Sequence, residues 1–441
     1  MSFHEKIIPG KGHILYWVPL PNERFDSNKI LGMDLDWTLI KPIKGKVHPI
    51  DESDWELLYN DTSAIEMIKT KQRLGYKFVI FTNQGGLLNN KPGKMNVEGF
   101  KTRWLHILEL LKITYDIKSI YLIVSLYDDF NRKPTTGMWD FLEKELNDNI
   151  KVIRQDSLYV GDMAGRKGDH SASDLLFSMN LGVDFQVPEV FFLGNASSKN
   201  KTTKLQKSIL EDENIFNGHK FIMDFPKSIS QQNKSITNEL LTYLHKNQCI
   251  VIFIGSPASG KSSYYHNYLS DEIQRNVNYM NMDTFLGTPA KFLKSIEAEL
   301  QLGNSVIIDN TNGTRKTRYK YLALVKKQQK DIKVIIVHIK TEKRICMHLN
   351  ALRTKINNIA SIQGVNTNEM ISVPAVAIHT YWKYFEPVNI EIESSTPNAS
   401  SIDKLFSIEF EPSFLEIEND SLSTTQHKIR GITPVEFSLF L

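Results

Sequence analysis

Ile250-Val251-Ile252-Phe253-Ile254-Gly255-Ser256-Pro257-Ala258-Ser259-Gly260-Lys261-Ser262 decides the fold of the second half of the chain. Its apolar run predicts a buried strand, and the glycines with Lys261 predict a phosphate-binding loop that leads into a helix, rather than a flexible turn. In such a loop, backbone N–H groups and the positive end of the helix face phosphate oxygens. Lys261 is expected to reach the β- and γ-phosphates of ATP, and Ser262 to bind Mg²⁺. The residues expected to bind the nucleotide are Gly255, Ser256, Pro257, Ala258, Ser259, Gly260, Lys261, Ser262, Ser263 and Thr311.

Three later positions point to transfer of that phosphate to a hydroxyl. Asp283 follows the expected strand Val277–Met280 and would accept the proton of the attacking hydroxyl, or else cap the next helix. Asp309 ends another strand in a Walker-B-like place, and Thr311 would touch the transferred phosphate, unless this segment is a plain turn. Arg353, on an expected helix, would cover the phosphate as a lid cation, or else stay solvated.

In the first half, Met33-Asp34-Leu35-Asp36-Trp37-Thr38-Leu39 places two carboxylates where the expected strand Ile30–Leu35 ends. Ligands of open α/β sheets bind at the carboxyl ends of strands, and residues two apart in a strand share a face. The pair suits aspartyl-phosphate chemistry, in which Asp34 attacks phosphorus and Asp36 acts as general acid and base. The alternative is a solvated turn closed by two aspartates.

Three further residues would complete a phosphoryl pocket beside this pair. Thr82 follows the strand Phe78–Phe81 and supplies a hydrogen bond, Lys133 supplies a countercharge, and Asp162 follows the strand Leu158–Val160 and supplies a third carboxylate. Taken singly, they would be a strand cap, a surface cation and a turn residue. Taken together they predict a magnesium site, whose expected ligands are Asp34, Asp36 and Asp162, with Ser262 as the ligand in the second half.

The length and composition of the chain limit the number of domains and the class of protein. A chain of 441 residues holds two or three domains at roughly 150 residues each. The content of 41% hydrophobic and 23% charged residues excludes a wholly disordered, collagen-like or coiled-coil chain. The net charge of +3 neither favours nor excludes binding to nucleic acid. Two cysteines and the lack of a long apolar run predict an intracellular protein without a membrane segment. We expect an α/β fold with two parallel-sheet domains, at residues 1–215 and 246–441, joined by a linker at 216–245.

The motifs of the first half resemble, in the same order, those of the haloacid-dehalogenase phosphatase superfamily. Phe81-Thr82-Asn83-Gln84 and Arg132-Lys133-Pro134-Thr135-Thr136-Gly137 are similar to the phosphatase half of the polynucleotide kinase 3′-phosphatase family, over about Ile30 to Gly194. Residues from about Cys249 to Pro387 resemble the kinase half of the same family. The resemblance implies a haloacid-dehalogenase-like Rossmannoid phosphatase followed by a P-loop kinase.

The resemblance also implies a function. It suggests an enzyme that hydrolyses 3′-phosphate ends through an aspartyl-phosphate and phosphorylates 5′-hydroxyl ends from ATP, using Mg²⁺, in the repair of DNA strand breaks. The implied partners are DNA ends, with RNA ends as the alternative, and the implied location is the nucleus. We expect a monomer.

The sequence departs from the family pattern at two positions. Trp37 stands where the family usually has glycine, and it would narrow the pocket mouth, stack on a substrate base or simply pack. Met282 stands where arginine often precedes the aspartate, so a secondary phosphate contact is expected to be missing. The animal members carry a forkhead-associated domain, for which the stretch of about thirty residues before Asp34 is too short.

Two rival functions stay open on the residues alone. One is a phosphatase-kinase fusion that acts on a metabolite, and the other is a binding scaffold whose phosphatase site has decayed at Trp37. A nucleic-acid substrate favours basic grooves that carry aromatic residues, whereas most charge runs are solvated faces. The candidate groups are Lys41, Lys44 and Lys46 with Trp37, and Arg315, Lys316, Arg318 and Lys320 with Tyr319 and Tyr321.

Overall fold

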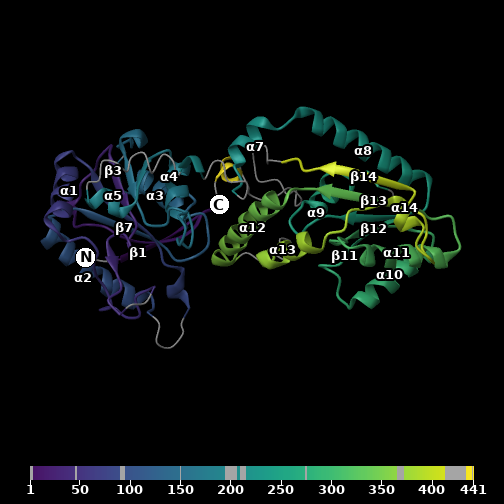
Figure 1. Cartoon of the computed structure of the whole chain (residues 1–441), viewed down its shortest axis with the longest axis horizontal. Coiled ribbons are helices and arrows are strands. Elements are labelled where there is room, and N and C mark those ends of the chain that lie inside the picture. The colour runs from purple at the N-terminus through teal and green to yellow at the C-terminus, as the bar shows by residue number, and fades with distance from the viewer. Residues whose placement is uncertain are drawn as a thin grey trace. The chain divides into compact units, whose positions relative to one another are not determined.

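The computed structural model describes residues 3–44, 47–89, 95–148, 150–193, 206–208, 215–273, 276–364, 372–412, 434–439 and 441. The chain divides into two compact units. The first comprises Met1–Gly218, Arg353–Ile371 and Leu439–Leu441, and the second comprises His219–Leu352 and Ser372–Ser438. Each unit is built on its own sheet with helices around it (Figure 1), so the predicted fold class is confirmed. The domain boundaries at residues 215 and 246 stay a prediction.

The first unit contains a seven-stranded sheet in the order β1-β2-β7-β6-β3-β8-β9. The last five strands of this order are parallel, whereas β1 and β2 form an antiparallel hairpin beside β7, which the sequence reasoning did not find. A separate antiparallel pair is formed by β4 and β5. The strands are β1 (Phe3–Ile8), β2 (Gly12–Trp17), β3 (Ile30–Met33), β4 (Ile40–Lys41), β5 (Glu56–Leu57), β6 (Lys77–Asn83), β7 (Ile120–Ser125), β8 (Leu158–Val160) and β9 (Asp184–Gln186).

Both faces of this sheet are buried. Phe78 and Ile80 of β6 join one apolar cluster and Val79 and Phe81 join the other, because successive strand residues point to opposite faces. Helices α1, α2 and α5 contribute to the first cluster and α3 and α4 to the second. A sheet covered on both faces leaves the carboxyl ends of its strands as the place for a site. The helices are α1 (Thr62–Arg73), α2 (Val97–Tyr115), α3 (Gly137–Glu145), α4 (Ser173–Leu181) and α5 (Pro188–Leu193), with 3-10 turns at Pro21–Glu23, Gly85–Leu88 and Arg154–Asp156.

The second unit contains a parallel sheet in the order β11-β12-β10-β13-β14. Helices α8 and α9 pack on one face, and α10 and α11 on the other (Figure 1). The strands are β10 (Cys249–Ile254), β11 (Val277–Asn281), β12 (Ser305–Asp309), β13 (Lys333–Lys340) and β14 (Lys404–Glu409). The helices are α7 (Gly218–Asp224), α8 (Lys227–Lys246), α9 (Lys261–Tyr268), α10 (Pro289–Gln301), α11 (Arg315–Gln328), α12 (Lys343–Ile362), α13 (Ala375–Tyr384), α14 (Ile390–Ser394) and α15 (Pro434–Ser438). None of the helices in the described ranges is both long and apolar enough to cross a membrane.

Helix α8 lies in the segment that the sequence suggested as a linker. Its Leu240 and Leu244 are buried in the core of the second unit. The side-chain amide of Asn233 donates to the carbonyl of Glu409 at 2.9 Å and accepts from the Glu409 N–H at 3.2 Å, at the end of β14. Most of this segment is therefore packed against the second sheet.

Candidate active sites

Asp34 directly follows β3, at the carboxyl end of the first sheet. Its N–H donates to the carbonyl of Val160 on β8 at 2.9 Å, so the sheet fixes its backbone. Lys133 Nζ donates to Asp34 Oδ1 at 2.6 Å, to Asp174 Oδ1 at 2.7 Å and to the hydroxyl of Tyr159 at 2.8 Å. Lys133 is only 4% exposed, and it is therefore a buried counterion that two carboxylates share.

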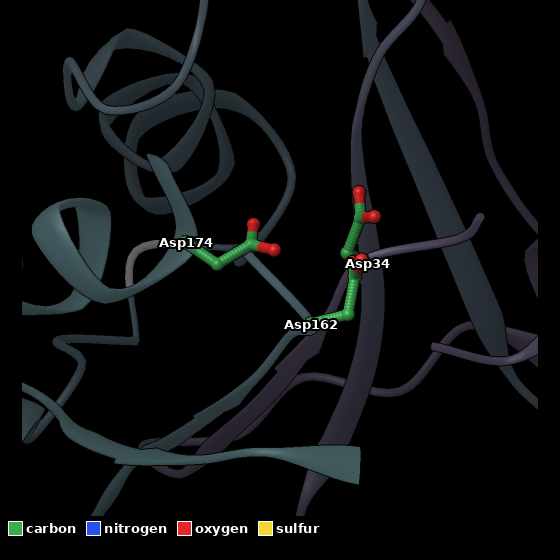
Figure 2. A group of neighbouring side chains, drawn as sticks. All are labelled: Asp34, Asp162 and Asp174. Atoms are coloured by element: carbon green, nitrogen blue, oxygen red, sulfur yellow. The ribbon is translucent and has the colours of Figure 1, made fainter. Parts of the chain in front are cut away.

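Three carboxylates converge at this point. Asp34, Asp162 and Asp174 each offer an oxygen, and these atoms lie within 4.8 Å of one another. Figure 2 shows the three side chains approaching one another from the end of β3, the end of β8 and α4. A Cβ atom on Gly161 would lie 2.4 Å from Asp174 Cγ, so a glycine is needed to bring α4 this close. Carboxylate oxygens are the ligands that Mg²⁺ prefers, and this donor set fits that ion.

The protonation of the pocket follows from its burial. Burial raises the pKa of Asp34 well above its ordinary value, against the attraction of Lys133. Burial, helped by the charge of Asp174, raises the pKa of Asp162 to about 7. Burial alone would lower the pKa of Lys133, but the charges of Asp174 and Asp34 raise it. Since three carboxylates face one ammonium, a divalent cation would neutralise the remaining negative charge.

Asp36 lies outside this acidic group. Its Oδ2 accepts from Gln84 Nε2 at 2.6 Å, and the same nitrogen lies 2.9 Å from the hydroxyl of Thr82. Arg103 Nη1 is 3.6 Å from Asp36 Oδ1. The strand period that predicted convergence of the two aspartates stops with β3 at Met33, so the two carboxylates have different partners. The metal-ligand role of Asp36 stays a prediction, and Asp174 is a member of the acidic group that sequence reasoning missed.

Trp37 has a backbone φ of 61°, in the left-handed region where glycine is favoured. This backbone gives a physical reason for the glycine that the resemblance led us to expect here. The indole Nε1–H donates to the carbonyl of Val47 at 2.8 Å, and the residue is 37% exposed. The buried carboxylate of Asp54 accepts N–H groups of Ile43, Lys44 and Ile50 in the same loop. The indole is therefore hydrogen-bonded to a loop that the Asp54 carboxylate stabilises from within.

The basic residues suggested beside Trp37 are paired with carboxylates. Lys41 Nζ is 3.1 Å from Glu56, and Lys44 Nζ is 2.6 Å from Asp51. Lys46 lies outside the described residues. Exposed pairs of this kind hold little energy and leave the cations open to exchange with a phosphate backbone.

In the second unit, the predicted phosphate-binding loop joins β10 to α9, and the helix begins at Lys261 as predicted. Ala258 and Gly260 have left-handed φ values of 61° and 95°. Lys261 Nζ donates to the carbonyls of Gly255 at 3.0 Å and Ser256 at 2.9 Å. The hydroxyl of Thr341 donates to the carbonyl of Ser259 at 2.7 Å, which ties the loop to the segment after β13. The loop is therefore already curled in the way that phosphate binding requires.

Asp309 at the end of β12 joins this loop to its neighbouring strands. The hydroxyl of Ser262 donates to Asp309 Oδ2 at 2.5 Å. The hydroxyl of Tyr279 and the amide of Asn281 reach the same oxygen. A loop serine beside a strand-end carboxylate is the arrangement that holds Mg²⁺ with a nucleotide in P-loop enzymes. The Walker-B-like place of Asp309 was visible in the sequence, but its contact with Ser262 was not.

The other predicted kinase residues lie on separate segments of the chain. Asp283 is exposed just beyond β11, where its N–H donates to Asn281 Oδ1 at 2.8 Å. The N–H of Gly255 donates to the carbonyl of Thr311 at 3.2 Å, so the loop and the end of β12 are linked. Arg353 lies half-buried on α12, in the part of that helix that belongs to the first unit. The catalytic roles of these residues stay predictions.

Two members of the basic and aromatic group on α11 belong to the interior. Arg318 is fully buried, with Nε 2.8 Å from one Glu393 oxygen and Nη2 2.5 Å from the other, and Tyr321 is in the core. Arg315, Lys316 and Tyr319 line a cavity of about 320 Å³. The residues of this group that remain candidates for contact with nucleic acid are therefore Arg315, Lys316, Tyr319 and Lys320.

Comparison with known proteins identifies both units. Residues 29–192 match the family described as polynucleotide kinase 3 phosphatase, and residues 250–364 match one described as an AAA domain. The chain is 30% identical over 352 residues to the bifunctional polynucleotide phosphatase/kinase of Schizosaccharomyces pombe, covering 78% of this chain and 76% of that protein. The chain belongs to the bifunctional polynucleotide phosphatase/kinase family.

Phosphatases without a kinase in their name are also similar to this member of the family. The polynucleotide 3′-phosphatase of Arabidopsis thaliana is 33% identical over 179 residues, which cover 39% of this chain and 25% of that protein. The polynucleotide 3′-phosphatase of Saccharomyces cerevisiae is 27% identical over 215 residues, covering 37% of this chain and 87% of that protein. The family predicted from the motifs is confirmed.

Proposed function

We propose that this phosphatase/kinase removes the 3′-phosphate from a DNA end and adds phosphate from ATP to a 5′-hydroxyl, in the nucleus, during strand-break repair. The observation that carries the proposal is the same in both units: charged and hydroxyl side chains suited to phosphate chemistry meet at the carboxyl ends of parallel strands. In the first unit these are Asp34, Lys133 and the two further aspartates, and in the second they are Lys261, Ser262 and Asp309.

In the phosphatase reaction, a carboxylate oxygen of Asp34 bonds to phosphorus while the bond from phosphorus to the 3′-oxygen breaks. Asp36 gives its proton to that leaving oxygen and then takes one from the water that hydrolyses the aspartyl-phosphate. Lys133 holds Asp34, and Thr82 would donate to a phosphate oxygen. Asp34, Asp162 and Asp174 would hold Mg²⁺, which supplies positive charge against the phosphate.

In the kinase reaction, the 5′-oxygen bonds to the γ-phosphorus of ATP, the bond to the leaving ADP breaks, and Asp283 takes the proton of the hydroxyl. Lys261 and the N–H groups of the loop hold the phosphates, and Arg353 would cover the transferred group. Ser262 and Asp309 would hold the Mg²⁺ that accompanies ATP.

A single gel tests the proposal. Wild-type protein is incubated with Mg²⁺, ATP and a DNA oligonucleotide that carries a 5′-hydroxyl and a 3′-phosphate, with the RNA twin in a parallel lane. We expect loss of the 3′-phosphate and gain of a 5′-phosphate, faster on DNA, and neither change when EDTA is present. Faster turnover of nucleoside phosphates or sugars than of oligonucleotides would favour the metabolite enzyme. Labelling of the 5′ end without release of the 3′-phosphate would favour the decayed phosphatase.

A further inference from the structure

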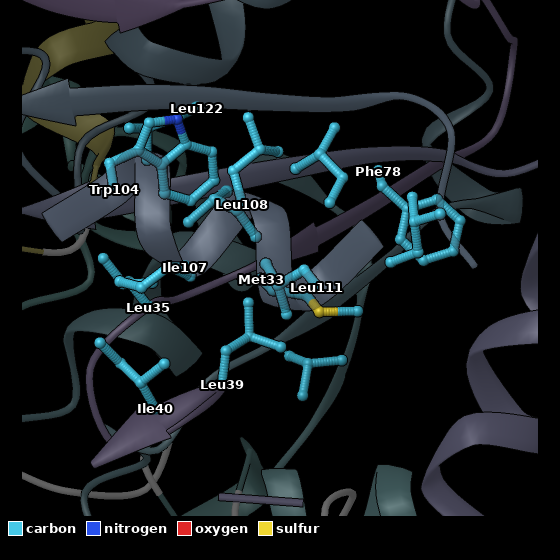
Figure 3. Close-up of a cluster of buried hydrophobic side chains, with 14 of the residues drawn as sticks. Met33, Leu35, Leu39, Ile40, Phe78, Trp104, Ile107, Leu108, Leu111 and Leu122 are labelled. Carbon is cyan, nitrogen blue, oxygen red and sulfur yellow. The ribbon is translucent and has the colours of Figure 1, made fainter. Parts of the chain in front are cut away.

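Arg103 of α2 is 0% exposed, although arginine is among the side chains that are least often buried. The helix that carries it is largely apolar on its buried side: Figure 3 shows Trp104, Ile107 and Leu108 of α2 in one buried cluster with Leu35. Taking a guanidinium out of water is strongly unfavourable unless a partner offsets the loss. The burial of this charge therefore needs a local reason.

The partner at ion-pair distance is Asp36. Arg103 Nη1 lies 3.6 Å from Asp36 Oδ1, and the guanidinium also lies 5.2 Å from the ring centre of Phe100. Within the described ranges, neither Asp36 Oδ1 nor any guanidinium nitrogen of Arg103 makes a hydrogen bond. Asp54, the other carboxylate whose charge acts on Arg103, is already occupied by three backbone N–H groups. Asp36 is thus the carboxylate that this cation can orient.

The two oxygens of Asp36 are held in different ways. Oδ2 accepts a short hydrogen bond of 2.6 Å from Gln84, whereas Oδ1 faces Arg103 across 3.6 Å. Oδ1 is buried although the Asp36 side chain is 20% exposed, so Oδ2 is the oxygen that can exchange protons with a leaving oxygen and with water. The ion pair to the buried oxygen orients the carboxylate, and Oδ2 keeps a lone pair available beside its hydrogen bond from Gln84.

We propose that Arg103 is a positioning residue of the 3′-phosphatase, which holds Asp36 through its buried Oδ1 so that Oδ2 meets the leaving 3′-oxygen. This inference rests on the proposed function, because it takes Asp36 as the general acid and base. The proposal gives α2, a helix that contains none of the motif residues, a role in the chemical step. A merely structural Arg103 would affect folding without acting through Asp36.

A double-mutant cycle separates these roles. Arg103→Met, Asp36→Asn and the double variant are made in the full chain, and kcat and KM are measured on a 3′-phosphorylated DNA oligonucleotide. Arg103→Met is expected to lower kcat about 100-fold and to change KM less than about threefold. In the Asp36→Asn background, the same substitution is expected to change the residual kcat less than about threefold. Arg103→Lys, which keeps the charge, is expected to recover at least about tenfold of the loss.

Lys101→Met, on the same helix but partly exposed, is the matched control and should leave both activities unchanged. An equal loss of kcat from Arg103→Met in both backgrounds would overturn the inference. If Arg103→Met does not give folded protein by its thermal unfolding transition, Arg103→Lys takes its place in the cycle, with the same two outcomes. Wild-type protein without 3′-phosphatase activity would instead overturn the proposed function.

Discussion

Lys133 and Lys261 are both buried lysines near the carboxyl ends of parallel strands, yet they bind different kinds of partner. Lys133 bridges two carboxylates, Asp34 and Asp174, whereas Lys261 donates to the backbone carbonyls of its own loop. In the phosphatase unit, opposite charges are therefore paired before any substrate arrives. In the kinase unit, the lysine can exchange neutral carbonyls for the phosphates of a nucleotide. In the proposed mechanism, hydrolysis uses an ion cluster that is already assembled, whereas in phosphoryl transfer the negative charge that pairs with Lys261 arrives with ATP.

The largest expected effect comes from removing one reactive group from each unit. Asp34→Asn should lower 3′-phosphate release by at least about 10⁴-fold and leave 5′ labelling unchanged, because the nucleophile is lost from one unit only. Lys261→Ala should do the reverse. End-labelling and phosphate release are measured on the same oligonucleotide. Asp184→Asn and Lys291→Ala, both exposed positions, are the controls, and loss of both activities in either active-site variant would mean that the sites are not independent.

Stability should distinguish the two lysines. Lys133→Met leaves two buried carboxylates without their cation and is expected to lower the free energy of unfolding by about 3–5 kcal/mol. Lys261→Met removes hydrogen bonds to carbonyls and should lower it by about 1 kcal/mol. Urea unfolding measures both losses, and the kinase transition is recognised because ATP with Mg²⁺ raises it. Equal losses in the two variants would remove the contrast between a preassembled and a substrate-completed site.

Acid should weaken the kinase unit through His338. Burial, with the charges of Lys340 and Arg318, lowers the pKa of His338 from 6.5 to about 4. Between these values the unfolded chain binds a proton that the folded unit does not bind, so the free energy of unfolding falls as the pH falls. The urea midpoint of the kinase transition should therefore decrease from pH 6.5 to pH 4. His338→Gln should reduce the slope, and an unchanged slope would show that another group, such as His348, is responsible.

The smallest effect is expected at Trp37. Glycine would relieve a left-handed backbone but would lose the hydrogen bond from the indole to Val47, and each contribution is about 1 kcal/mol. Trp37→Gly should therefore change the free energy of unfolding by no more than about 1 kcal/mol and should keep or raise the phosphatase rate. Steady-state kinetics and urea unfolding measure the two effects. A complete loss of phosphatase activity would mean that the indole takes part in the reaction.

Residues next to strand ends could be predicted from the sequence. Asp162 and Lys261 are found where short apolar runs and loop chemistry predicted them, because burial of a strand and the turn that follows it are local properties. Thr82 was expected just after its strand but lies inside β6, one residue before the strand ends. The antiparallel β1 was less visible, because its residues are exposed or half-buried and give no apolar run.

Contacts that depend on topology could not be predicted. Asp174 lies in the first turn of α4, and no recognisable motif surrounds it in the sequence. Its carboxylate reaches Lys133 only because α4 packs tightly against Gly161. Asp36 was expected beside Asp34, but the strand ends too early for the two-residue period to hold. Arg103 carries no sequence signal, since nothing in a helical pattern tells a buried arginine from a solvated one.

The contact between Asn233 and the end of β14 has a consequence for solubility. An edge strand offers unpaired N–H and C=O groups, to which a strand of another molecule can add. The Asn233 amide satisfies both backbone groups of Glu409, and α8 packs along this strand. A shortened protein that begins after α8 would expose this edge and is expected to aggregate, so a kinase fragment should be cut before Lys227.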